Sequence, residues 1–285
     1  MSAVPEAVQQ WLRAHNHGQV TGVRSTSGGC IHQSMTVQTT AGATFFLKLN
    51  STAPEDMFER EAAGLEALRA AGGPKIPQVF LQRQDFLLLE DLQPGNLSPD
   101  YWTSLGRQLA AVHQQHRPRF GFEHDNYIGS TPQPNGWDED GWRFFADQRL
   151  RYQGKLARDR GYLDRADIQR LERLCSRLPE LIPEQNASLL HGDLWSGNVI
   201  SDGQGHPALI DPAVYYGWAE ADLAMTELFG SLPEECYQAY RTVRPLDPGW
   251  RSRYPIYNLY HLLNHLNLFG RGYLSRVQGI LKRFG

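Results

Sequence analysis

Cysteine is scarce in this chain of 285 residues, which contains only Cys30, Cys175 and Cys236, far apart from one another. An odd number of widely spaced cysteines argues against both a disulfide framework and a cysteine-based zinc site. The chain also lacks any apolar run near the roughly 18 residues that a membrane-spanning helix needs. Its first 18 residues are polar and helix-like, without the apolar core of a secretion signal. We therefore expect a reduced, cytoplasmic protein with no membrane partner.

An excess of charge of either sign is also missing. The 28 lysines and arginines nearly balance the 31 aspartates and glutamates, which leaves a formal net charge of −3. We therefore expect no overall basic field that would attract nucleic acid or an anionic membrane. Hydrophobic residues make up 41% of the chain, an ordinary value for a globular protein, and the length allows one large domain or two lobes.

The first 90 residues or so combine strand and helix patterns. Segments rich in β-branched and aromatic residues are separated by turns that contain glycine, which is typical of strands. The predicted strands lie near 19–25, 33–40, 43–50, 77–83 and 86–92, and the predicted helices cover 4–16 and the stretch from 57 to the Gly72-Gly73-Pro74 stop. The pattern predicts a five-stranded antiparallel sheet with one helix before it and one inserted within it.

The pattern becomes mainly helical after a junction marked by Pro94-Gly95 and Ser98-Pro99. Helices are predicted at 98–116, 141–159 and 165–182, with three more after residue 220. Residues 188–211 are the only β-like interruption. Residues 117–141, rich in proline, glycine and asparagine, predict a long ordered loop.

Residues 191–198 read HGDLWSGN and stand between two short apolar runs. Two glycines in eight residues disfavour a helix, so we expect a tight loop between two strands. A further apolar strand ends at Asp211, 18 residues after Asp193. Protein-kinase-like phosphotransferases use an aspartate that accepts a hydroxyl proton, then an asparagine and a second aspartate that ligate Mg²⁺. Asp193, Asn198 and Asp211 follow this order, and His191 is expected to hold the loop through backbone hydrogen bonds.

Such a site needs further residues upstream, and the chain has them in the required order. The turn between the first two predicted strands contains Gly28 and Gly29. Lys48 lies on the third predicted strand. Its partner on the following helix is expected to be Glu61, with Glu59 as the less favoured alternative.

The adenine is expected to bind backbone groups of a hinge at Glu90, Asp91 and Leu92, just before the junction. The complete set predicts an α+β, protein-kinase-like, two-lobed fold. Residues 1–92 would form an N-terminal ATP-binding lobe, a five-stranded antiparallel sheet plus helix, and residues 93–285 a mainly helical C-terminal catalytic and substrate lobe. ATP and Mg²⁺ are the cofactors that this arrangement requires.

Two features favour a small molecule as the phosphate acceptor. Asp222 follows Asp211 after only ten residues, which leaves no room for a long activation segment that docks a peptide. Trp195 lies two residues after Asp193, where protein kinases have a lysine. Both features resemble aminoglycoside phosphotransferases and choline kinases.

A more specific resemblance is carried by HGDLWSGN with the later DPAVYYGWAEADLAMTELFG, and by SGGCI, NYIGSTPQPNGW and YHLLNHLNLFG. Over essentially its full length the chain resembles the fructosamine (ketosamine-3) kinase family. The resemblance implies ATP-dependent phosphorylation of the 3-hydroxyl of ketosamines, the adducts of sugars with amines, including protein lysines. Such phosphates eliminate and free the amine, so a deglycation repair activity is implied. Trp218 stands where family members often have histidine, which could alter the rim of the substrate site.

The resemblance also implies a role for each candidate residue. Asp193 would be the general base, and Asn198 and Asp211 the Mg²⁺ ligands. Lys48 with Glu61 would hold the α- and β-phosphates.

Four further assignments concern the surroundings of that set. Asp222 is expected to brace the catalytic loop rather than touch substrate. Trp195 and His265 are the candidates for the substrate pocket, because an aromatic face can pack on a sugar ring. A satisfied core histidine is an equal alternative for His265, and it is the favoured interpretation for His113, His116 and His261.

Two other functions stay open at this point. One is another small-molecule kinase of the same fold, acting on an aminoglycoside, choline or a pentose. The other is a catalytically inactive ATP-binding module, which the complete set of site residues disfavours. Cys30, in the glycine turn, is either a small residue tolerated there or a redox-sensitive thiol that could form a disulfide-linked homodimer.

Overall fold

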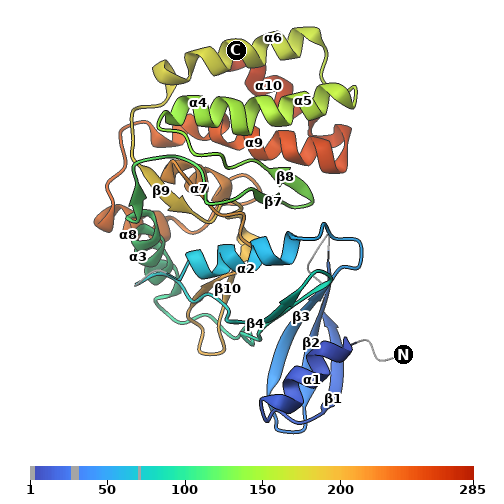
Figure 1. Ribbon diagram of the computed structural model, residues 1–285. Helices are drawn as coiled ribbons and strands as arrows, with labels where there is room; N and C mark the ends of the chain where they lie inside the picture. The colour runs from blue at the N-terminus through green and yellow to red at the C-terminus, as the bar shows by residue number, and fades with distance from the viewer. Residues whose placement is uncertain (1–3, 27–31, 70–71) are drawn as a thin grey trace.

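The structure, a computed structural model, describes residues 4–26, 32–69 and 72–285. Figure 1 shows a sheet at one end of the molecule and a mass of helices at the other. The sheet is antiparallel, with the strand order β1-β2-β3-β5-β4. Its strands are β1 Val20–Thr26, β2 Gln33–Thr39, β3 Thr44–Leu49, β4 Val79–Arg83 and β5 Phe86–Glu90. All five predicted strands are confirmed, with ends that shift by at most two residues.

Each face of this sheet packs against a different helix. The two helices are α1 (Glu6–Ala14) and α2 (Met57–Ala67). Alternate residues of a strand point to opposite faces of the sheet, and β5 has buried side chains on both faces. Leu88 packs in one cluster with Leu12 of α1, whereas Leu87 joins the main core together with Leu65 of α2. The sheet therefore holds α2 between itself and the helical part of the chain (Figure 1).

The rest of the chain is mainly helical. Its helices are α3 Tyr101–His113, α4 Gly141–Phe145, α5 Tyr152–Asp159, α6 Arg165–Leu181, α7 Ala219–Thr226, α8 Glu234–Val243, α9 Trp250–Phe269 and α10 Leu274–Phe284, with a π-helical segment, Ala146–Arg151, between α4 and α5. Helices α3 and α8 cross so closely that a Cβ at Gly106 would collide with the carbonyl oxygen of Cys236. Within the described ranges, no helix has the length and apolar character needed to cross a membrane.

Three helices, α8, α9 and α10, begin after residue 220 as predicted, and α7 begins just before it at Ala219. Residues 219–285 are all described and contain four α-helices, α7 to α10. The long final stretch is divided at Gly270, whose φ of +84° ends α9 before α10 begins at Leu274. Positive φ favours glycine and cannot continue a right-handed helix.

Short strands complete the helical part, and most lie outside the predicted β region. They are β6 His116–Arg117, β7 Asn126–Ile128, β8 Thr131–Gln133, β9 Ala187–Leu190, β10 Val199–Ser201, β11 Pro207–Leu209 and β12 Tyr215–Gly217. Strand β9 pairs with β12 and β6, β10 with β11, and β7 with β8. The expected loop at 117–141 thus contains a hairpin. Strands of two or three residues are too short to show the alternation that identifies them in sequence.

The connection between β5 and α3 is attached to the β10–β11 hairpin. The Gly95 N–H donates to the carbonyl oxygen of Asp202 at 3.3 Å, and the Ser201 hydroxyl donates to the Gly95 oxygen at 2.8 Å. The Ser98 N–H donates to the carbonyl oxygen of Gly205 at 3.0 Å. The division into lobes after residue 92 stays a prediction.

Candidate active site

The loop after β9 is shaped by its glycine and held by a buried aspartate. Gly192 has φ +81°, and a Cβ there would collide with the carbonyl oxygen of Ala213, so only glycine fits. The Asp222 carboxylate on α7 accepts the backbone N–H groups of His191 at 2.7 Å and Gly192 at 2.9 Å. Asp222 thereby fixes the start of the loop.

A buried histidine supports Asp222 from behind. Nε2 of His113 on α3 lies 3.2 Å from Oδ2 of Asp222, and Nδ1 lies 2.8 Å from the Tyr240 hydroxyl. Burial lowers the pKa of His113, so the ring is neutral, with Nε2–H donating to Asp222 and Nδ1 accepting from Tyr240. Burial would raise the pKa of Asp222, but its hydrogen bonds outweigh burial and lower the pKa. Sequence reasoning treated His113 as a core histidine and missed this partner, 109 residues away.

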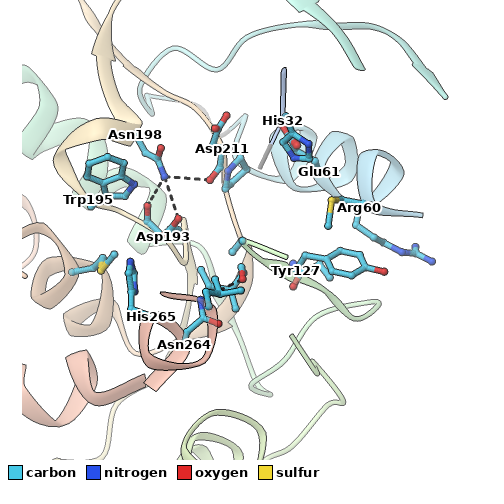
Figure 2. Close-up of a pocket in the computed structure, with 18 of the residues that line it drawn as sticks. His32, Arg60, Glu61, Tyr127, Asp193, Trp195, Asn198, Asp211, Asn264 and His265 are labelled. Carbon is cyan, nitrogen blue, oxygen red and sulfur yellow. Dashed lines mark hydrogen bonds between the residues drawn. The ribbon is translucent and has the colours of Figure 1, made fainter. Parts of the chain in front are cut away.

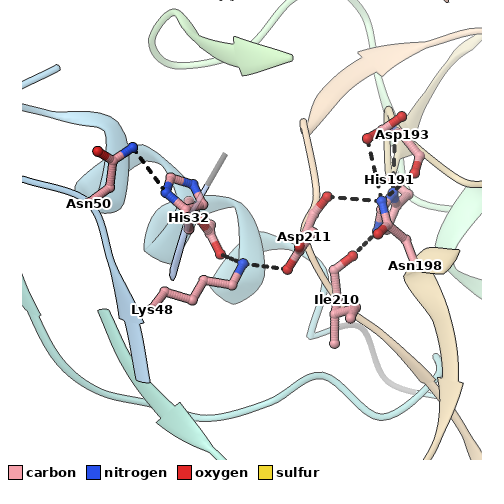
Figure 3. Close-up of polar contacts among 9 residues, drawn as sticks. His32, Lys48, Asn50, His191, Asp193, Asn198, Ile210 and Asp211 are labelled. Atoms are coloured by element: carbon pink, nitrogen blue, oxygen red, sulfur yellow. Dashed lines mark hydrogen bonds and ion pairs between the residues drawn. The ribbon is translucent and has the colours of Figure 1, made fainter. Parts of the chain in front are cut away.

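His191 connects the loop to the neighbouring strand end (Figure 3). Its Nε2 lies 2.9 Å from the Ile210 carbonyl oxygen, and its Nδ1 accepts the Asp193 N–H at 3.2 Å. These contacts place the proton on Nε2. Burial lowers the pKa of His191, so the ring stays neutral at pH 7. One neutral ring therefore holds the backbone next to both aspartates of the site.

Asp193, Asn198 and Asp211 converge at the end of this loop (Figures 2 and 3). Nδ2 of Asn198 donates to the main-chain oxygen of Asp193 at 2.8 Å. The same nitrogen lies 3.4 Å from a carboxylate oxygen of Asp193 and 3.4 Å from the main-chain oxygen of Asp211. Asp211 has φ +56°, a left-handed conformation that a residue other than glycine adopts only when its surroundings enforce it.

The Asp193 carboxylate faces the cavity in a negative environment. Burial, followed by repulsion from Asp211 and Asp222, raises the pKa of Asp193 to about 7. The contact from Asn198 opposes this shift only in part. A carboxylate whose pKa lies near the working pH is suited to accept and release a proton.

Lys48 on β3 is buried between two carboxylates (Figure 3). Its Nζ lies 2.6 Å from Oε1 of Glu61 on α2, and it also contacts Oδ1 of Asp211. Burial would lower the pKa of Lys48, but the two carboxylates outweigh it and raise the pKa, so the lysine is charged. Glu59, the alternative partner, has a side chain that is 60% exposed and lies 3.6 Å from Arg60. The residue that contacts Lys48 is therefore Glu61.

These side chains lie on the wall of one cavity of about 870 Å³ (Figure 2). Its polar inner part is formed by the described residues His32, Lys48, Glu61, Asp193, Asn198 and Asp211. Its outer part is largely aromatic and is formed by Tyr127, Trp195, Phe229, His265, Phe269 and Tyr273. The cavity therefore combines a charged floor with an apolar rim.

Trp195 and His265, the two expected substrate residues, both line this cavity. The Trp195 side chain covers Gly197, where a Cβ would collide with the indole ring, and it remains 39% exposed. The His265 ring packs on Phe229 at 4.9 Å and on Tyr273 at 5.1 Å between centroids. His265 is therefore part of the aromatic rim rather than a fully enclosed core histidine.

The predicted hinge residues, Glu90, Asp91 and Leu92, are not among the described residues of this cavity wall. The Glu90 N–H already donates to the Gln78 carbonyl oxygen at 2.8 Å, so only other backbone groups of the hinge are available to adenine. Three further candidates lie outside the residues that the structure describes: Gly28, Gly29 and Cys30.

Trp218, whose effect on the substrate rim was left open, does not lie on that rim. Its side chain is 3% exposed, and Trp218 is absent from the described residues that line the cavity. It packs instead against three aromatic rings at 5.6 to 6.1 Å, those of Phe120, Phe145 and Tyr257. The Trp218 indole ring is part of the hydrophobic core, because aromatic rings from three separate segments surround it.

The donor atoms around Asn198 and Asp211 fit Mg²⁺ bound to a nucleotide. Among residues 4–26, 32–69 and 72–285, no three His, Cys, Asp or Glu side chains are grouped so that they could hold a metal by themselves. Mg²⁺ usually needs only one or two protein ligands, because phosphate and water oxygens complete its octahedron. Asn198 uses Nδ2 within the loop and Asp211 uses Oδ1 for Lys48, which leaves Asn198 Oδ1 and Asp211 Oδ2 for a cation.

Comparison with known proteins finds relatives over nearly the whole chain. Residues 4–284 match the family model described as fructosamine kinase. A probable ketoamine kinase of Synechocystis sp. is 42% identical over 269 residues, which cover 91% of this chain and 89% of that protein. A chloroplastic protein-ribulosamine 3-kinase of Arabidopsis thaliana is 39% identical over 292 residues, which cover 99% of this chain and 88% of that protein.

Solved structures share the same architecture. A candidate fructosamine-3-kinase from Thermobifida fusca is 32% identical, with a TM-score of 0.89 and a coverage of 98% of both chains. An aminoglycoside phosphotransferase in complex with ADP and hygromycin B is 18% identical, with a TM-score of 0.63 over 97% of this chain and 98% of that one. At that identity the likeness concerns the fold alone. The α+β, protein-kinase-like fold predicted from the sequence is confirmed.

Proposed function

The chain belongs to the fructosamine kinase family, and we propose that it transfers the γ-phosphoryl group of ATP to the 3-hydroxyl of ketosamines. Relatives named ketoamine kinase and protein-ribulosamine 3-kinase support this substrate class. The observation that carries the proposal is the convergence of Asp193 with Asn198 and Asp211 on one cavity. The Lys48–Glu61 pair lies on the same wall.

In the proposed reaction the acceptor hydroxyl lies beside Asp193. Asp193 accepts the hydroxyl proton while the acceptor oxygen forms its bond to the γ-phosphorus. The bond from that phosphorus to the β–γ bridging oxygen breaks, and ADP leaves with the electron pair. His191 and Asp222 contribute by holding the backbone of the loop, so that the Asp193 carboxylate keeps its place.

The phosphates of ATP would be held by residues from both parts of the chain. Lys48, oriented by Glu61, would bind the α- and β-phosphates. Asn198 and Asp211 would hold Mg²⁺, which would supply positive charge to offset that of the phosphates. We propose that the glycine turn covers the phosphates and that hinge backbone groups bind the adenine, as the family resemblance implies.

The aromatic rim supports a sugar acceptor. We propose that the sugar ring packs on Trp195, whose indole face is partly exposed, and that His265 lies beside the amine-bearing part. The Asp193 carboxylate and the His265 ring line the same cavity and would bind sugar hydroxyls. The pocket therefore offers both an apolar face and hydrogen-bond partners, the two surfaces that a sugar presents.

The proposed product is a ketosamine 3-phosphate. Because such phosphates eliminate and free the amine, we propose a role in protein or small-molecule deglycation. This part of the proposal, like the cytoplasmic location, rests on the family resemblance and on composition. A redox-dependent homodimer through Cys30 stays a prediction.

A substrate screen tests the proposal. Ribulosamine, fructosamine, choline and kanamycin are offered as acceptors, with Asp193→Asn as the control for contaminating kinases. Ketosamines should exceed the other two by more than about tenfold in kcat/KM, about 1.4 kcal/mol in transition-state binding. Phosphorus NMR then locates the phosphate on the 3-hydroxyl.

Other outcomes of the screen separate the alternatives. A preference for kanamycin or choline would show that the substrate class is wrong, although the kinase fold would stand. Absence of ATP turnover with every acceptor would favour the inactive ATP-binding module.

A further inference from the structure

The β7–β8 hairpin reaches from the helical part of the chain to the helix that carries Glu61. In Figure 1 the hairpin lies beside α2. The Tyr127 hydroxyl of β7 donates a 2.6 Å hydrogen bond to Oδ1 of Asp56, the residue immediately before α2. Glu61 follows Asp56 by five residues, about 7.5 Å along the helix axis. The hydrogen bond therefore lies little more than one turn from the contact with Lys48.

The other side of the hairpin is fixed to the segment that follows Asp211. Nδ2 of Asn126 donates to the Val214 carbonyl oxygen at 2.8 Å, and Nε2 of Gln133 donates to that of Ala213 at 3.0 Å. Both side chains are buried. The hairpin is thus anchored to the same backbone that carries Asp211, and it presents Tyr127 from a rigid base.

The hydrogen bond between Tyr127 and Asp56 has a charged acceptor. The Tyr127 hydroxyl and then Arg60, whose Nε lies 2.9 Å from Oδ2, lower the pKa of Asp56, although burial opposes them. Burial, followed by the contact with Asp56, raises the pKa of Tyr127 to about 12, so the tyrosine is the donor. Hydrogen bonds to a charged group are stronger than neutral ones.

Helix α2 also rests directly on the Asp211 segment. A Cβ at Gly64 would lie 3.3 Å from the Val214 side chain and 3.5 Å from that of Pro212. Helix α2 is therefore held at two points by the helical part of the chain, at Asp56 by the Tyr127 hydroxyl and at Gly64 by the segment that follows Asp211.

We infer that Tyr127 is a positioning residue for the phosphate clamp: its hydrogen bond to Asp56 holds α2 where Glu61 reaches Lys48. The inference rests on the proposed function and assigns a further residue to the same site. Tyr127 itself lines the cavity, whereas Asp56 is absent from the described residues that line it. This difference allows a positioning role to be separated from direct contact with the acceptor.

The test measures binding of the Mg²⁺ complex of a non-hydrolysable ATP analogue by calorimetry, without any acceptor. Tyr127→Phe and Asp56→Asn should each raise Kd about fivefold, and the double variant should be no weaker than either, as expected for one shared interaction. In a Glu61→Gln background, Tyr127→Phe should change Kd less than about twofold, because the contact that it positions is already lost. Since the Asp56 side chain is 39% exposed, its replacement should not prevent folding.

Tyr162→Phe is the matched control. Tyr162 is a partly buried tyrosine, absent from the described residues that line the cavity, and its replacement should leave Kd unchanged. An unchanged Kd in Tyr127→Phe overturns the inference, as does an equal weakening with and without Glu61. The inference is also overturned if Tyr127→Phe changes only the KM for the acceptor while Asp56→Asn changes neither Kd nor KM. That result would assign Tyr127 to direct contact with the acceptor. Because no acceptor is present, failure of the ketosamine screen would not affect this measurement.

Discussion

Replacement of Asp222 by asparagine should weaken both the fold and the catalytic loop. The buried carboxylate accepts from three donors, the N–H groups of His191 and Gly192 and Nε2 of His113. Asparagine keeps one acceptor oxygen and turns an NH₂ group toward at least one donor. A hydrogen bond to a charged group contributes about 1.5–3 kcal/mol. Loss of one or two such bonds should lower the free energy of unfolding by about 3 kcal/mol, or Tm by roughly 6 °C for a chain of this length.

Calorimetry gives the stability, and steady-state kinetics well below the Tm of the variant give the activity. We expect kcat to fall more than about tenfold, because the loop that carries Asp193 loses its anchor. Asp167→Asn is the matched control, since Asp167 is equally buried on α6 and accepts from Arg170 at 3.1 Å and Gln278 at 2.8 Å. It should destabilise the fold but leave kcat unchanged. A folded Asp222→Asn variant with wild-type kcat, or equal losses of kcat in both variants, would refute the reasoning.

Four further expectations follow from the site. Asp193→Asn should lower kcat by about 10²–10⁴-fold, while nucleotide Kd measured by calorimetry stays within about twofold; near-wild-type kcat would contradict its role as base. Asp211→Ala should instead weaken Mg²⁺-ATP binding and raise the Mg²⁺ concentration needed for activity, and an unchanged Mg²⁺ titration would count against it. Trp195→Ala should raise the KM for the acceptor more than the KM for ATP, and the reverse order would exclude a sugar contact. Burial lowers the pKa of His113 and His191, so the unfolded chain binds protons that the folded chain does not, and each ring should lower the free energy of unfolding by up to about 1.4 kcal/mol per pH unit below about pH 6.5. The raised pKa of Asp193 acts in the opposite sense over this range, so urea denaturation at pH 7 and pH 5.5 is carried out on Asp193→Asn, and equal stability of that variant at the two values would contradict neutral rings in the fold.

Local patterns were sufficient to predict the elements that carry the proposed phosphate site. Lys48 and Glu61 could be located because a strand and the helix after it have clear periodicities, and the structure brings the two side chains to 2.6 Å. The loop at 191–198 could be located because its two glycines and polar residues interrupt apolar runs, which form β9 and β10. In both cases the residue types themselves limit the local backbone.

Contacts between distant segments could not be predicted in this way. The partners His113 and Asp222 come from α3 and α7, and their contact depends on how two helices pack. The burial of Trp218 likewise depends on rings from three segments, which no local pattern specifies. The left-handed conformation of Asp211 has no sequence signal either, since aspartate adopts it only where surrounding contacts enforce it.

The arrangement of hydrogen-bond donors explains why two aspartates of the same site, Asp193 and Asp222, can have different roles. Asp222 accepts from two backbone N–H groups and a histidine, its pKa is lowered, and it is buried and absent from the described residues that line the cavity. Among the described residues, the side chain that donates to the Asp193 carboxylate is that of Asn198 at 3.4 Å, and Asp193 lies on the cavity wall. Environments that push the pKa values of neighbouring carboxyl groups apart are how proteins assign them separate roles. The proposal of Asp193 as base and Asp222 as anchor therefore depends on the hydrogen-bond donors that each carboxylate receives, and not on the residue type, which is the same in both.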